Sequence, residues 1–561
     1  MRVSASLPSR LPIRPRGPMP QALSPYPQRG IDENLELQAR VRPAHTAIVF
    51  YGRELSYAAL WRDVEALAGF LARELGVRPG DRVAVDLQNS PHYVIAFYAT
   101  LRAGAVVVPL NPMYRADEVG AILTDSGVTV AIVAADLVDR FSGWAGAERL
   151  RLVVARYADA LPPEPVAPTP AFMHLPAPDL AADPRLVSWA EAVTTDCRTI
   201  PRNQPGSLCV MPYTSGSTGR PKGCPHTHAS VMHTAALQAE WYELSPASVA
   251  TAVQPLFHVA GMQATLNGGI YAGATLLIMA RWDAAAAVEL FSRYRPTFFN
   301  APPTMVIDLL AQPSFTDRAL DSVKVVSGGG TAMPVAVAEQ LERRFGLVYI
   351  EGYGMSETMS PTHLNPIAAP RAGSVGVTVP QTVACIVDPE TLAPLPDGEV
   401  GEILVAGPQM ISGYWNNPDA DRQAFAVVGG RRMLRTGDLG HRTADGYYHV
   451  VDRLKRMINA SGFKVWPAEV EGLLFAHEAV AQCCVIAAPD AYRGETVKAL
   501  IVLKPQAKGK VGEADIIGWA RERLAVFKVP RQVEFVDSLP LTASNKVDWR
   551  ALQAQAAAHA P

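Results

Sequence analysis

The chain has 561 residues, of which 49% are hydrophobic and 19% are charged, and its formal net charge is −2. This length predicts two or more domains, and the composition predicts packed globular structure instead of extended disorder. A chain without a basic excess lacks the charge to hold a phosphate backbone, which excludes nucleic acid as the main partner.

The first thirty residues are rich in proline and arginine, and no Asp or Glu precedes Asp32. Because the apolar core of a signal peptide is missing, we expect residues 1–30 to be a flexible extension, with a targeting peptide as the alternative. From about residue 45 helix and strand patterns alternate. Ser56 can cap a helix in which apolar residues recur at helical spacing as far as Leu75.

The next elements predict a parallel sheet. A strand is expected at 82–87, a helix at 91–103 and a second strand at 105–109. Strand, helix and strand within about thirty residues form a βαβ unit, whose two strands run parallel. A stretch rich in Pro and Ala at 161–178 is typical of a surface loop.

A domain boundary is predicted near residues 452–455, because the remaining residues have a pattern of their own. This pattern is a helix at 467–474, strands at 481–488 and 497–503, and a helix at 513–524. We therefore expect an α/β protein. Its large N-terminal body, residues 31–452, is multi-lobed with mainly parallel sheets, and residues 453–561 form a small α+β domain.

The cysteines are scattered and form no C-x-x-C pair, so we interpret them as reduced structural thiols of a cytoplasmic protein. A thiol catalyst or a zinc site is the alternative. The cysteines are Cys197, Cys209, Cys224, Cys385, Cys483 and Cys484. No stretch predicts a membrane span, since Arg102, Gly104 and Pro109 interrupt the most apolar region. The sequence neither predicts nor excludes peripheral contact with a membrane or the formation of a homodimer.

The most informative segment runs from Tyr213 to Gly223, with the sequence YTSGSTGRPKG. Glycines let the backbone approach a ligand, hydroxyls donate hydrogen bonds, and Lys222 adds a positive charge. In the common nucleotide loop Ser or Thr follows the Lys at the head of a helix, whereas here Pro221 precedes Lys222 and glycine follows it. The pattern favours an anion cradle of another kind over a flexible polar linker.

This loop resembles the phosphate-binding signature of the adenylate-forming superfamily, which includes acyl-CoA synthetases, adenylation domains and firefly-type luciferases. The resemblance runs from about residue 35 to about residue 550 and is carried by several separate motifs in the expected order. It implies that ATP, Mg²⁺, coenzyme A and a small carboxylic acid bind the protein, and that the C-terminal domain is mobile. The loop residues it assigns to ATP are Thr214, Ser215, Gly216, Ser217, Thr218, Gly219 and Lys222.

The segment Pro255–Gly261, with the sequence PLFHVAG, resembles the stretch that lines the carboxylate pocket in the family. The resemblance implies that His258 gates the approach of the acceptor thiol, although a lone histidine is more often a core or surface residue. Amino-acid-activating relatives place an Asp where His258 stands. An amino acid is therefore disfavoured as the substrate.

Two glycine-rich segments follow. The first comes after a strand expected at 323–326, and a glycine turn at the carboxyl end of a strand often holds a ligand in open α/β sheets, although many such turns only connect elements. The resemblance implies that these residues flank adenine and the acyl pocket: Gly328, Gly329 and Gly330.

The second segment, Gly352–Glu357, has the sequence GYGMSE. The resemblance places Gly352 and Gly354 at the nucleotide, Tyr353 on the adenine ring and Ser356 at the α-phosphate. Glu357 would help to hold Mg²⁺ together with Thr214. A hard, oxygen-ligated cation suits the charge of a leaving pyrophosphate. A solvated surface carboxylate is the plain alternative for Glu357.

Further motifs lie near the predicted boundary. The resemblance implies that Asp438, in the sequence RTGDL, accepts the ribose hydroxyls, as carboxylates do in other nucleotide sites. It implies that Arg453 contacts ribose or phosphate and that Lys455 is the hinge of the mobile domain. It also implies a loop that reaches the pantetheine tunnel of coenzyme A, formed by Ser461, Gly462 and Phe463.

The last motif surrounds Lys546, which matches the catalytic lysine of the adenylation step in the family. A lysine this near the terminus would by itself be a solvated charge. Asn545 stands where glycine is usual, and Asn tolerates left-handed backbone angles better than most residues. The implied catalytic set is thus Lys546, Glu357, His258 and Lys222.

Together these motifs predict an enzyme that converts a carboxylic acid and ATP into an acyl-adenylate and pyrophosphate. The acyl group then passes to coenzyme A, which releases AMP. Residues 113–114, 261–263 and 459–467 are similar to bacterial medium- and long-chain fatty acyl-CoA ligases, so a fatty acid is expected. An aryl or other acid, or a carrier protein as the acceptor, is the alternative. The Walker spacing of a phosphate-loop kinase is absent.

Overall fold

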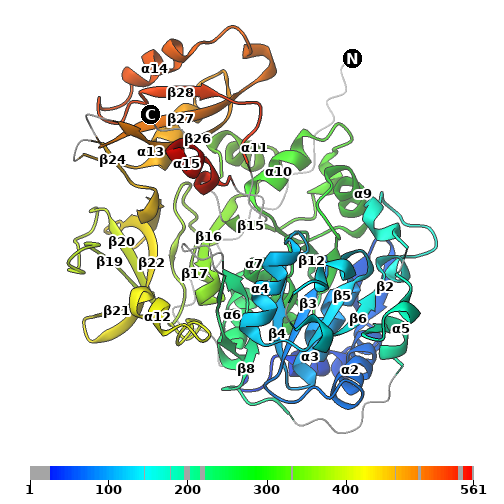
Figure 1. Cartoon of the computed structure of the whole chain (residues 1–561). Helices are drawn as coiled ribbons and strands as arrows, with labels where there is room; N and C mark the ends of the chain where they lie inside the picture. The colour runs from blue at the N-terminus through cyan, green and yellow to red at the C-terminus, as the bar shows by residue number, and fades with distance from the viewer. Residues whose placement is uncertain are drawn as a thin grey trace, which may run out of the picture. The chain divides into compact units, whose positions relative to one another are not determined.

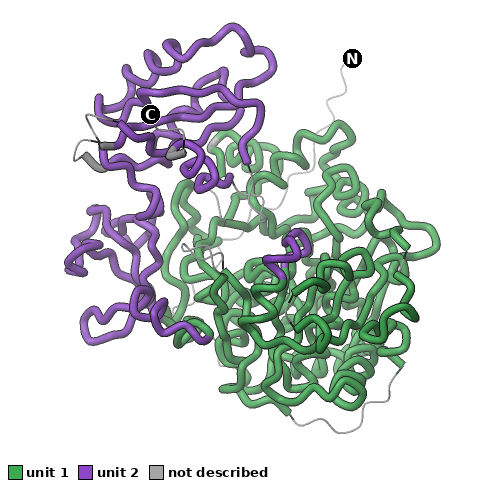
Figure 2. The backbone as a smooth tube through the Cα atoms, viewed as in Figure 1, with its two compact units in different colours: residues 1–110, 120–382, 407–415 green, residues 111–119, 383–406, 416–561 purple. Residues whose placement is uncertain are grey.

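The computed structural model describes residues 26–144, 146–176, 178–194, 202–214, 221–329, 333–460, 463–490, 494–540 and 547–558. The chain divides into two compact units, which Figure 2 colours separately. Unit 1 comprises residues 1–110, 120–382 and 407–415, and unit 2 comprises residues 111–119, 383–406 and 416–561.

One sheet of unit 1 contains the predicted βαβ unit. Its strands follow the order β11-β8-β4-β3-β5-β6-β7, and only the edge strand β11 is antiparallel to its neighbour. The helix α3 (Pro91–Arg102) connects β3 to β4, which pair in parallel as predicted. The strands are β3 (Arg82–Asp86), β4 (Val106–Pro109), β5 (Val130–Ala134), β6 (Arg151–Ala155), β7 (Leu186–Ser188), β8 (Leu208–Val210) and β11 (His226–Thr227).

The second sheet of unit 1 has the order β18-β17-β16-β15-β14-β12-β13-β1-β2. Its central strands are parallel, whereas β2, β17 and β18 are antiparallel to their neighbours. The strands are β1 (Thr46–Phe50), β2 (Arg53–Ser56), β12 (Val249–Ala252), β13 (Thr275–Ile278), β14 (Phe298–Asn300), β15 (Val325–Gly329), β16 (Tyr349–Met355), β17 (Ser360–Leu364) and β18 (Val377–Thr378).

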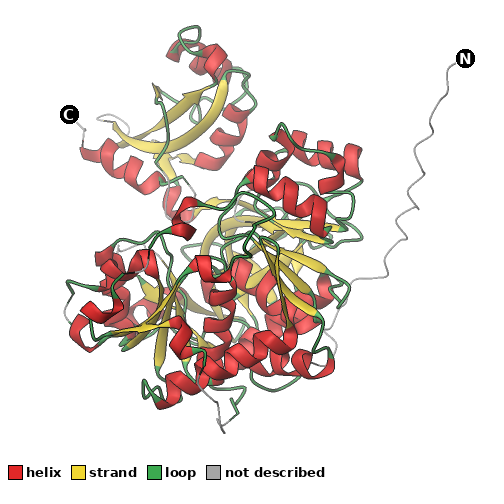
Figure 3. Ribbon diagram, turned by 90° about the vertical axis from the view of Figure 1, so that its right-hand side faces the viewer, coloured by secondary structure: helices red, strands yellow, loops and turns green. Residues whose placement is uncertain are grey.

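Helices flank the sheets of unit 1, as expected for parallel strands that are buried on both faces (Figures 1 and 3). The predicted cap is confirmed, because the Ala59 N–H donates to Ser56 Oγ at 3.3 Å. The capped helix ends at Arg73, so Leu75 lies beyond it. The longer helices are α1 (Asp32–Val41), α2 (Tyr57–Arg73), α6 (His228–Trp241), α9 (Ala284–Tyr294), α10 (Pro303–Ala311) and α11 (Val335–Phe345). The helix α4 (Ala116–Ser126) belongs to unit 1 from residue 120 onward.

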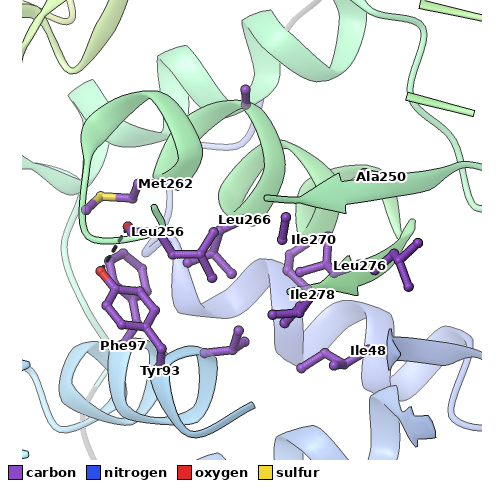
Figure 4. Close-up of a cluster of buried hydrophobic side chains, with 14 of the residues drawn as sticks. Ile48, Tyr93, Phe97, Ala250, Leu256, Met262, Leu266, Ile270, Leu276 and Ile278 are labelled. Atoms are coloured by element: carbon purple, nitrogen blue, oxygen red, sulfur yellow. Dashed lines mark hydrogen bonds between the residues drawn. The ribbon is translucent and has the colours of Figure 1, made fainter. Parts of the chain in front are cut away.

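A buried segment of unit 1 supports residues 255–261 (Figure 4). The short helix α7 (Val259–Gly261) continues as π-helical turns at Met262–Asn267 and then as α8 (Gly268–Ala272). Met262, Leu266 and Ile270 are buried in the core. Tyr93 Oη of α3 donates to the Leu256 carbonyl at 2.9 Å, which fixes the chain just before His258.

Residues 383–406 and 416–453 contribute an antiparallel sheet to unit 2, so the N-terminal body combines mainly parallel sheets with this antiparallel sheet. Its order is β19-β20-β22-β21, with β23 also paired to β22. The elements are β19 (Val383–Val387), β20 (Gly401–Ala406), α12 (Pro418–Ala424), β21 (Phe425–Val428), β22 (Arg431–Arg442) and β23 (Tyr448–Arg453).

The remainder of unit 2 has the predicted α+β pattern. The antiparallel strands β24 to β27 form a sheet, and β28 adds to β27 in parallel. The elements are β24 (Ile458–Ala460), β25 (Phe463–Val465), α13 (Pro467–Phe475), β26 (Val480–Asp490), β27 (Gly494–Leu503), α14 (Glu513–Arg521), β28 (Gln532–Phe535) and α15 (Trp549–Ala558). Within the described ranges, no helix has the length and apolar character needed to cross a membrane.

Candidate active site

A two-stranded ladder closes the base of the predicted phosphate-binding loop. Thr214 of β9 (Tyr213–Thr214) pairs with Lys222 of β10 (Lys222–Gly223), so the two ends of the loop lie side by side. As predicted, no helix begins at Lys222. The loop residues Ser215, Gly216, Ser217, Thr218 and Gly219 lie outside the described residues.

The base of this loop is anchored from two directions. Tyr213 Oη donates to Asp125 Oδ2 at 2.6 Å, and the Trp415 N–H donates to the Gly223 carbonyl at 2.9 Å. A Cβ atom on Gly223 would lie 3.0 Å from Trp415 Cβ and 3.1 Å from Tyr213 Cζ. A larger residue at position 223 would therefore displace one of these two aromatic residues by a few tenths of an ångström.

The glycines at 328 and 329 lie within a strand and not in the turn that the sequence predicts. The strand begins at Val325 and runs to Gly329, and its register pairs Gly329 with Gly352 of β16. A Cβ atom on Gly328 would overlap the Ala301 carbonyl and Tyr349 Oη, and one on Gly329 would overlap the Gly352 carbonyl. These glycines thus permit close strand packing at the carboxyl ends of parallel strands. Gly330 lies outside the described residues.

The predicted residues Gly352, Tyr353 and Gly354 lie near the carboxyl end of β16. Tyr353 lies on β16, and its ring centroid is 5.7 Å from that of His363 on β17. A side chain on Gly354 would overlap the backbone of Ser360. After β16 a 3-10 turn at Ser356–Thr358 places Ser356 and Glu357.

Sequence reasoning missed His226, which holds this turn. His226 is buried, and burial lowers the pKa of His226 to about 4, so the imidazole is neutral near pH 7. Its Nε2 lies 2.7 Å from the Ser356 carbonyl, and because a carbonyl only accepts, Nε2 carries the proton and donates. A histidine in a short strand gave no signal of this contact in the sequence.

Glu357 is buried and tied to a segment that sequence reasoning also missed. Tyr414 Oη donates to Glu357 Oε1 at 2.8 Å, and the Ile411 N–H donates to the Glu357 carbonyl at 2.9 Å. Lys222 Nζ lies 5.1 Å from the centroid of the Tyr414 ring. Thr214, Lys222 and Glu357 therefore share one neighbourhood in unit 1. Two adjacent aromatic residues in a polar turn were the only hint of this segment.

His258 lies at the N-terminus of α7. It is exposed, and its Nδ1 accepts the Ala260 N–H at 3.4 Å. The residue follows β12, which pairs with β14, and β14 pairs with β15. His258 therefore follows the carboxyl end of a strand in the sheet that also carries Gly329 and Tyr353.

The available donors fit magnesium bound together with phosphates. In the described part of the chain, no three His, Cys, Asp or Glu side chains are grouped to hold a metal ion. Mg²⁺ usually takes one or two carboxylates and completes its shell with phosphate oxygens and water. The Glu357 carboxylate and the Thr214 hydroxyl are hard oxygen donors of this kind.

Unit 2 carries Asp438 on a distorted strand. Gly437 has φ +69 inside β22, and Asp438 beside it is buried. Arg453 Nε on β23 lies 3.0 Å from Asp438 Oδ1. The two side chains that the sequence assigns to the nucleotide are thus direct neighbours.

Lys455 lies between two anchored arginines. It is exposed in a 3-10 turn at Leu454–Arg456. Arg453 pairs with Asp438 of β22, whereas Arg456 pairs with Glu471 of α13 and also donates to the Val485 carbonyl at 3.2 Å. The chain thus passes from one sheet to the next at Lys455.

Phe463 is the first residue of β25. Ser461, Gly462 and Lys546 lie outside the described residues.

The chain resembles known proteins over most of its length. Residues 35–415 match the family model of the AMP-binding enzyme, and residues 469–546 match its C-terminal domain. The chain is 36% identical over 540 residues to a long-chain-fatty-acid–CoA ligase of Bacillus subtilis, covering 94% of this chain and 95% of the relative. It is 35% identical to a feruloyl-CoA synthase of Amycolatopsis sp., covering 91% of this chain and 96% of the relative.

Among solved structures, ATP-bound MatB from Rhodopseudomonas palustris superimposes with a TM-score of 0.81. Its sequence is 27% identical, and the match covers 93% of this chain and 99% of that protein. The family models, the relatives and the fold agree over nearly the whole length. The chain belongs to the AMP-binding enzymes of the adenylate-forming superfamily.

Proposed function

We propose that this AMP-binding enzyme is an acid–CoA ligase that works in two steps. In the first step the carboxylate of the acid attacks the α-phosphorus of ATP, which gives an acyl-adenylate and releases pyrophosphate. In the second step the thiol of coenzyme A attacks the acyl carbon, and AMP leaves. The observation that carries the proposal is the neighbourhood of Lys222, Thr214 and Glu357 around Tyr414.

This neighbourhood suits phosphoryl chemistry. A carboxylate is a poor electrophile, and conversion to a mixed anhydride gives it a good leaving group. Such a step needs positioning and charge neutralisation more than covalent help from the protein. Lys222 supplies a cation at the base of the loop, and Glu357 with Thr214 supplies oxygen donors to Mg²⁺, which would neutralise charge on the leaving pyrophosphate.

Two further residues complete the adenylation step in this proposal. Asp438 accepts the ribose hydroxyls, and Lys546 approaches the reacting phosphate. Rotation of the C-terminal domain about Lys455 then withdraws Lys546 and brings residues 461–463 toward coenzyme A. Arg453 pairs with Asp438 of β22, whereas Arg456 pairs with Glu471 of α13 and with Asp452 of β23 and donates to the Val485 carbonyl of β26. The change of partners on either side of Lys455 supports this residue as the pivot.

A medium- or long-chain fatty acid is the acid that we propose. The likeness to the Bacillus ligase supports it, as does the resemblance of residues 113–114, 261–263 and 459–467 to fatty acyl-CoA ligases. An amino acid is disfavoured as the substrate, because His258 stands where amino-acid-activating relatives have an Asp. An aryl acid is the second candidate, because the feruloyl-CoA synthase has nearly the same identity to this chain.

A panel of acids tests the proposed substrate. The purified protein is incubated with ATP, Mg²⁺ and coenzyme A together with acetate, octanoate, dodecanoate, palmitate, benzoate or ferulate, and AMP release is measured. We expect the highest kcat/KM for octanoate, dodecanoate or palmitate. A higher value for ferulate or benzoate would move the assignment to an aryl acid ligase, and a higher value for acetate would contradict both.

A further inference from the structure

Tyr414 is a side chain of this neighbourhood to which the sequence motifs assign no role. Its hydroxyl donates to Glu357 Oε1 at 2.8 Å, and its ring centroid lies 5.1 Å from Lys222 Nζ. Lys222 belongs to the phosphate loop and Glu357 to the turn after β16, and 134 intervening positions separate them in the sequence (223 to 356). Tyr414 therefore contacts an anion and a cation that come from distant parts of unit 1.

The backbone around Tyr414 fixes it between these two groups. The Ile411 N–H donates to the Glu357 carbonyl, and the Trp415 N–H donates to the Gly223 carbonyl, each at 2.9 Å. Trp415 Nε1 also donates to the Asp125 carbonyl at 3.1 Å. Hydrogen bonds on both sides of Tyr414 thus hold the segment against the turn and against the loop at once.

The chemistry of a tyrosine suits this place. A neutral hydroxyl orients a carboxylate while leaving its negative charge intact, whereas a lysine or arginine would neutralise the charge and compete with a metal ion. A carboxylate has about four lone-pair sites, so one hydrogen bond leaves oxygen electrons to bind a cation. The ring meanwhile attracts an ammonium group that lies within about 6 Å of its centroid.

We propose that Tyr414 is a positioning residue for the magnesium–ATP complex, acting through Glu357 with its hydroxyl and through Lys222 with its ring. The inference rests on the proposed function. Groups that orient metal ligands typically contribute a factor of about 10 to 100 to metal affinity. The loss of the hydroxyl therefore weakens binding of the nucleotide only when the metal is present.

The test separates the hydroxyl from the ring. Binding of α,β-methylene-ATP, which cannot release pyrophosphate, is measured by titration calorimetry with Mg²⁺ and again with EDTA. For Tyr414→Phe we expect Kd to rise about 10-fold with Mg²⁺ and to change less than 2-fold with EDTA. For Tyr414→Leu, which also removes the ring, Kd rises in both conditions.

A matched control and a double variant exclude a general effect on folding. Tyr57 Oη donates to the Ala274 carbonyl in the core at 2.6 Å, so Tyr57→Phe also removes a hydroxyl hydrogen bond and should leave both Kd values unchanged. If Tyr414 acts through Glu357, Tyr414→Phe adds no further loss of Mg²⁺-dependent affinity in a Glu357→Gln background.

The outcomes distinguish this inference from the proposed function. Equal Kd values for the wild type and Tyr414→Phe, or equal losses with Mg²⁺ and with EDTA, would overturn the positioning role while acid-dependent AMP release by the wild type upholds the ligase. A wild type that does not bind the analogue would overturn both.

Discussion

Arg453 Nε on β23 lies 3.0 Å from Asp438 Oδ1 on β22, and the two residues are direct cross-strand partners. The Asp438 side chain is 5% exposed and the Arg453 side chain is 57% exposed. The exposed cationic partner holds the buried carboxylate in one orientation. A carboxylate held in this way has two oxygens, each of which can accept a hydrogen bond from a hydroxyl group.

The first prediction concerns Asp438. In Asp438→Ala we expect KM for ATP to rise at least 10-fold while KM for the acid changes less than 2-fold, because hydrogen bonds to a charged group contribute about 1.5–3 kcal/mol. Steady-state kinetics with each substrate varied in turn measures both constants. Arg453→Ala serves as the comparison and should raise KM for ATP less, since its side chain is mostly solvated. Equal increases in the two KM values for Asp438→Ala would contradict a ribose contact.

The second prediction concerns the pivot at Lys455. Proline at this position restricts φ to about −65° and so opposes a change of backbone angles. In Lys455→Pro we expect one half-reaction to slow at least 10-fold relative to the other, because only one domain arrangement remains accessible. The two half-reactions are measured as pyrophosphate release and as thioester formation from supplied acyl-adenylate. Lys455→Ala, which removes the charge without fixing φ, should leave their ratio within about 2-fold, and an unchanged ratio in both variants would place the pivot elsewhere.

The third prediction concerns Lys546, which the sequence assigns to adenylation alone. In Lys546→Ala pyrophosphate release should fall about 100-fold or more, because a positioned charge at the reacting phosphate is lost. Thioester formation from supplied acyl-adenylate should change less than 3-fold. Parallel losses in both half-reactions would show that the two steps do not divide between two arrangements.

The fourth prediction concerns stability and pH at Asp86. This carboxylate is fully buried, Arg140 Nη2 donates to its Oδ2 at 2.8 Å, and its Oδ1 has no partner among the described residues. Burial raises the pKa of Asp86 to about 6 from 3.8. The pKa of Asp86 is higher in the folded state than in the unfolded state. The contribution of Asp86 to the free energy of unfolding is therefore fully present below about pH 4 and is lost as the pH rises through 6.

Asp86→Asn removes the titration while keeping the shape of the side chain. From pH 4 to pH 7 we expect the free energy of unfolding of the wild type to fall by about 3 kcal/mol relative to the variant. Urea unfolding at both pH values measures the difference. A wild type that gains stability relative to Asp86→Asn over this range would show that the Arg140 ion pair outweighs burial.

Local patterns in the sequence predicted the elements that depend on nearby residues. Ser56 and the leucines after it predict a capped helix, and the runs at 82–87 and 105–109 predict parallel strands, because capping and periodicity act within a few residues. The glycines at 328 and 329 were misplaced into a turn, since the strand length depends on pairing with β16. The sequence cannot show that the Ala301 and Gly352 carbonyls and Tyr349 Oη lie close to these two glycines in the fold.

The candidate site also contains residues that short motifs predict and residues that they do not. Short motifs predict Lys222, Glu357 and Asp438 as site residues, because these residues stand in segments that resemble a known family. Tyr414 and His226 were missed, since each acts on a residue far along the chain through a hydrogen bond that depends on the folded structure. The sequence around a single tyrosine or histidine does not reveal which distant residue it will hydrogen-bond in the fold.

The central claim is that the acid is activated as its adenylate and then transferred to coenzyme A. The most direct measurement incubates the purified protein with ATP, Mg²⁺, coenzyme A and dodecanoate, then quantifies AMP, ADP and dodecanoyl-CoA by liquid chromatography with mass detection. The account predicts one AMP for each dodecanoyl-CoA formed, with no ADP, and no AMP when the acid is omitted. Release of ADP, or AMP formed in excess without any thioester from any acid of the panel, would contradict it.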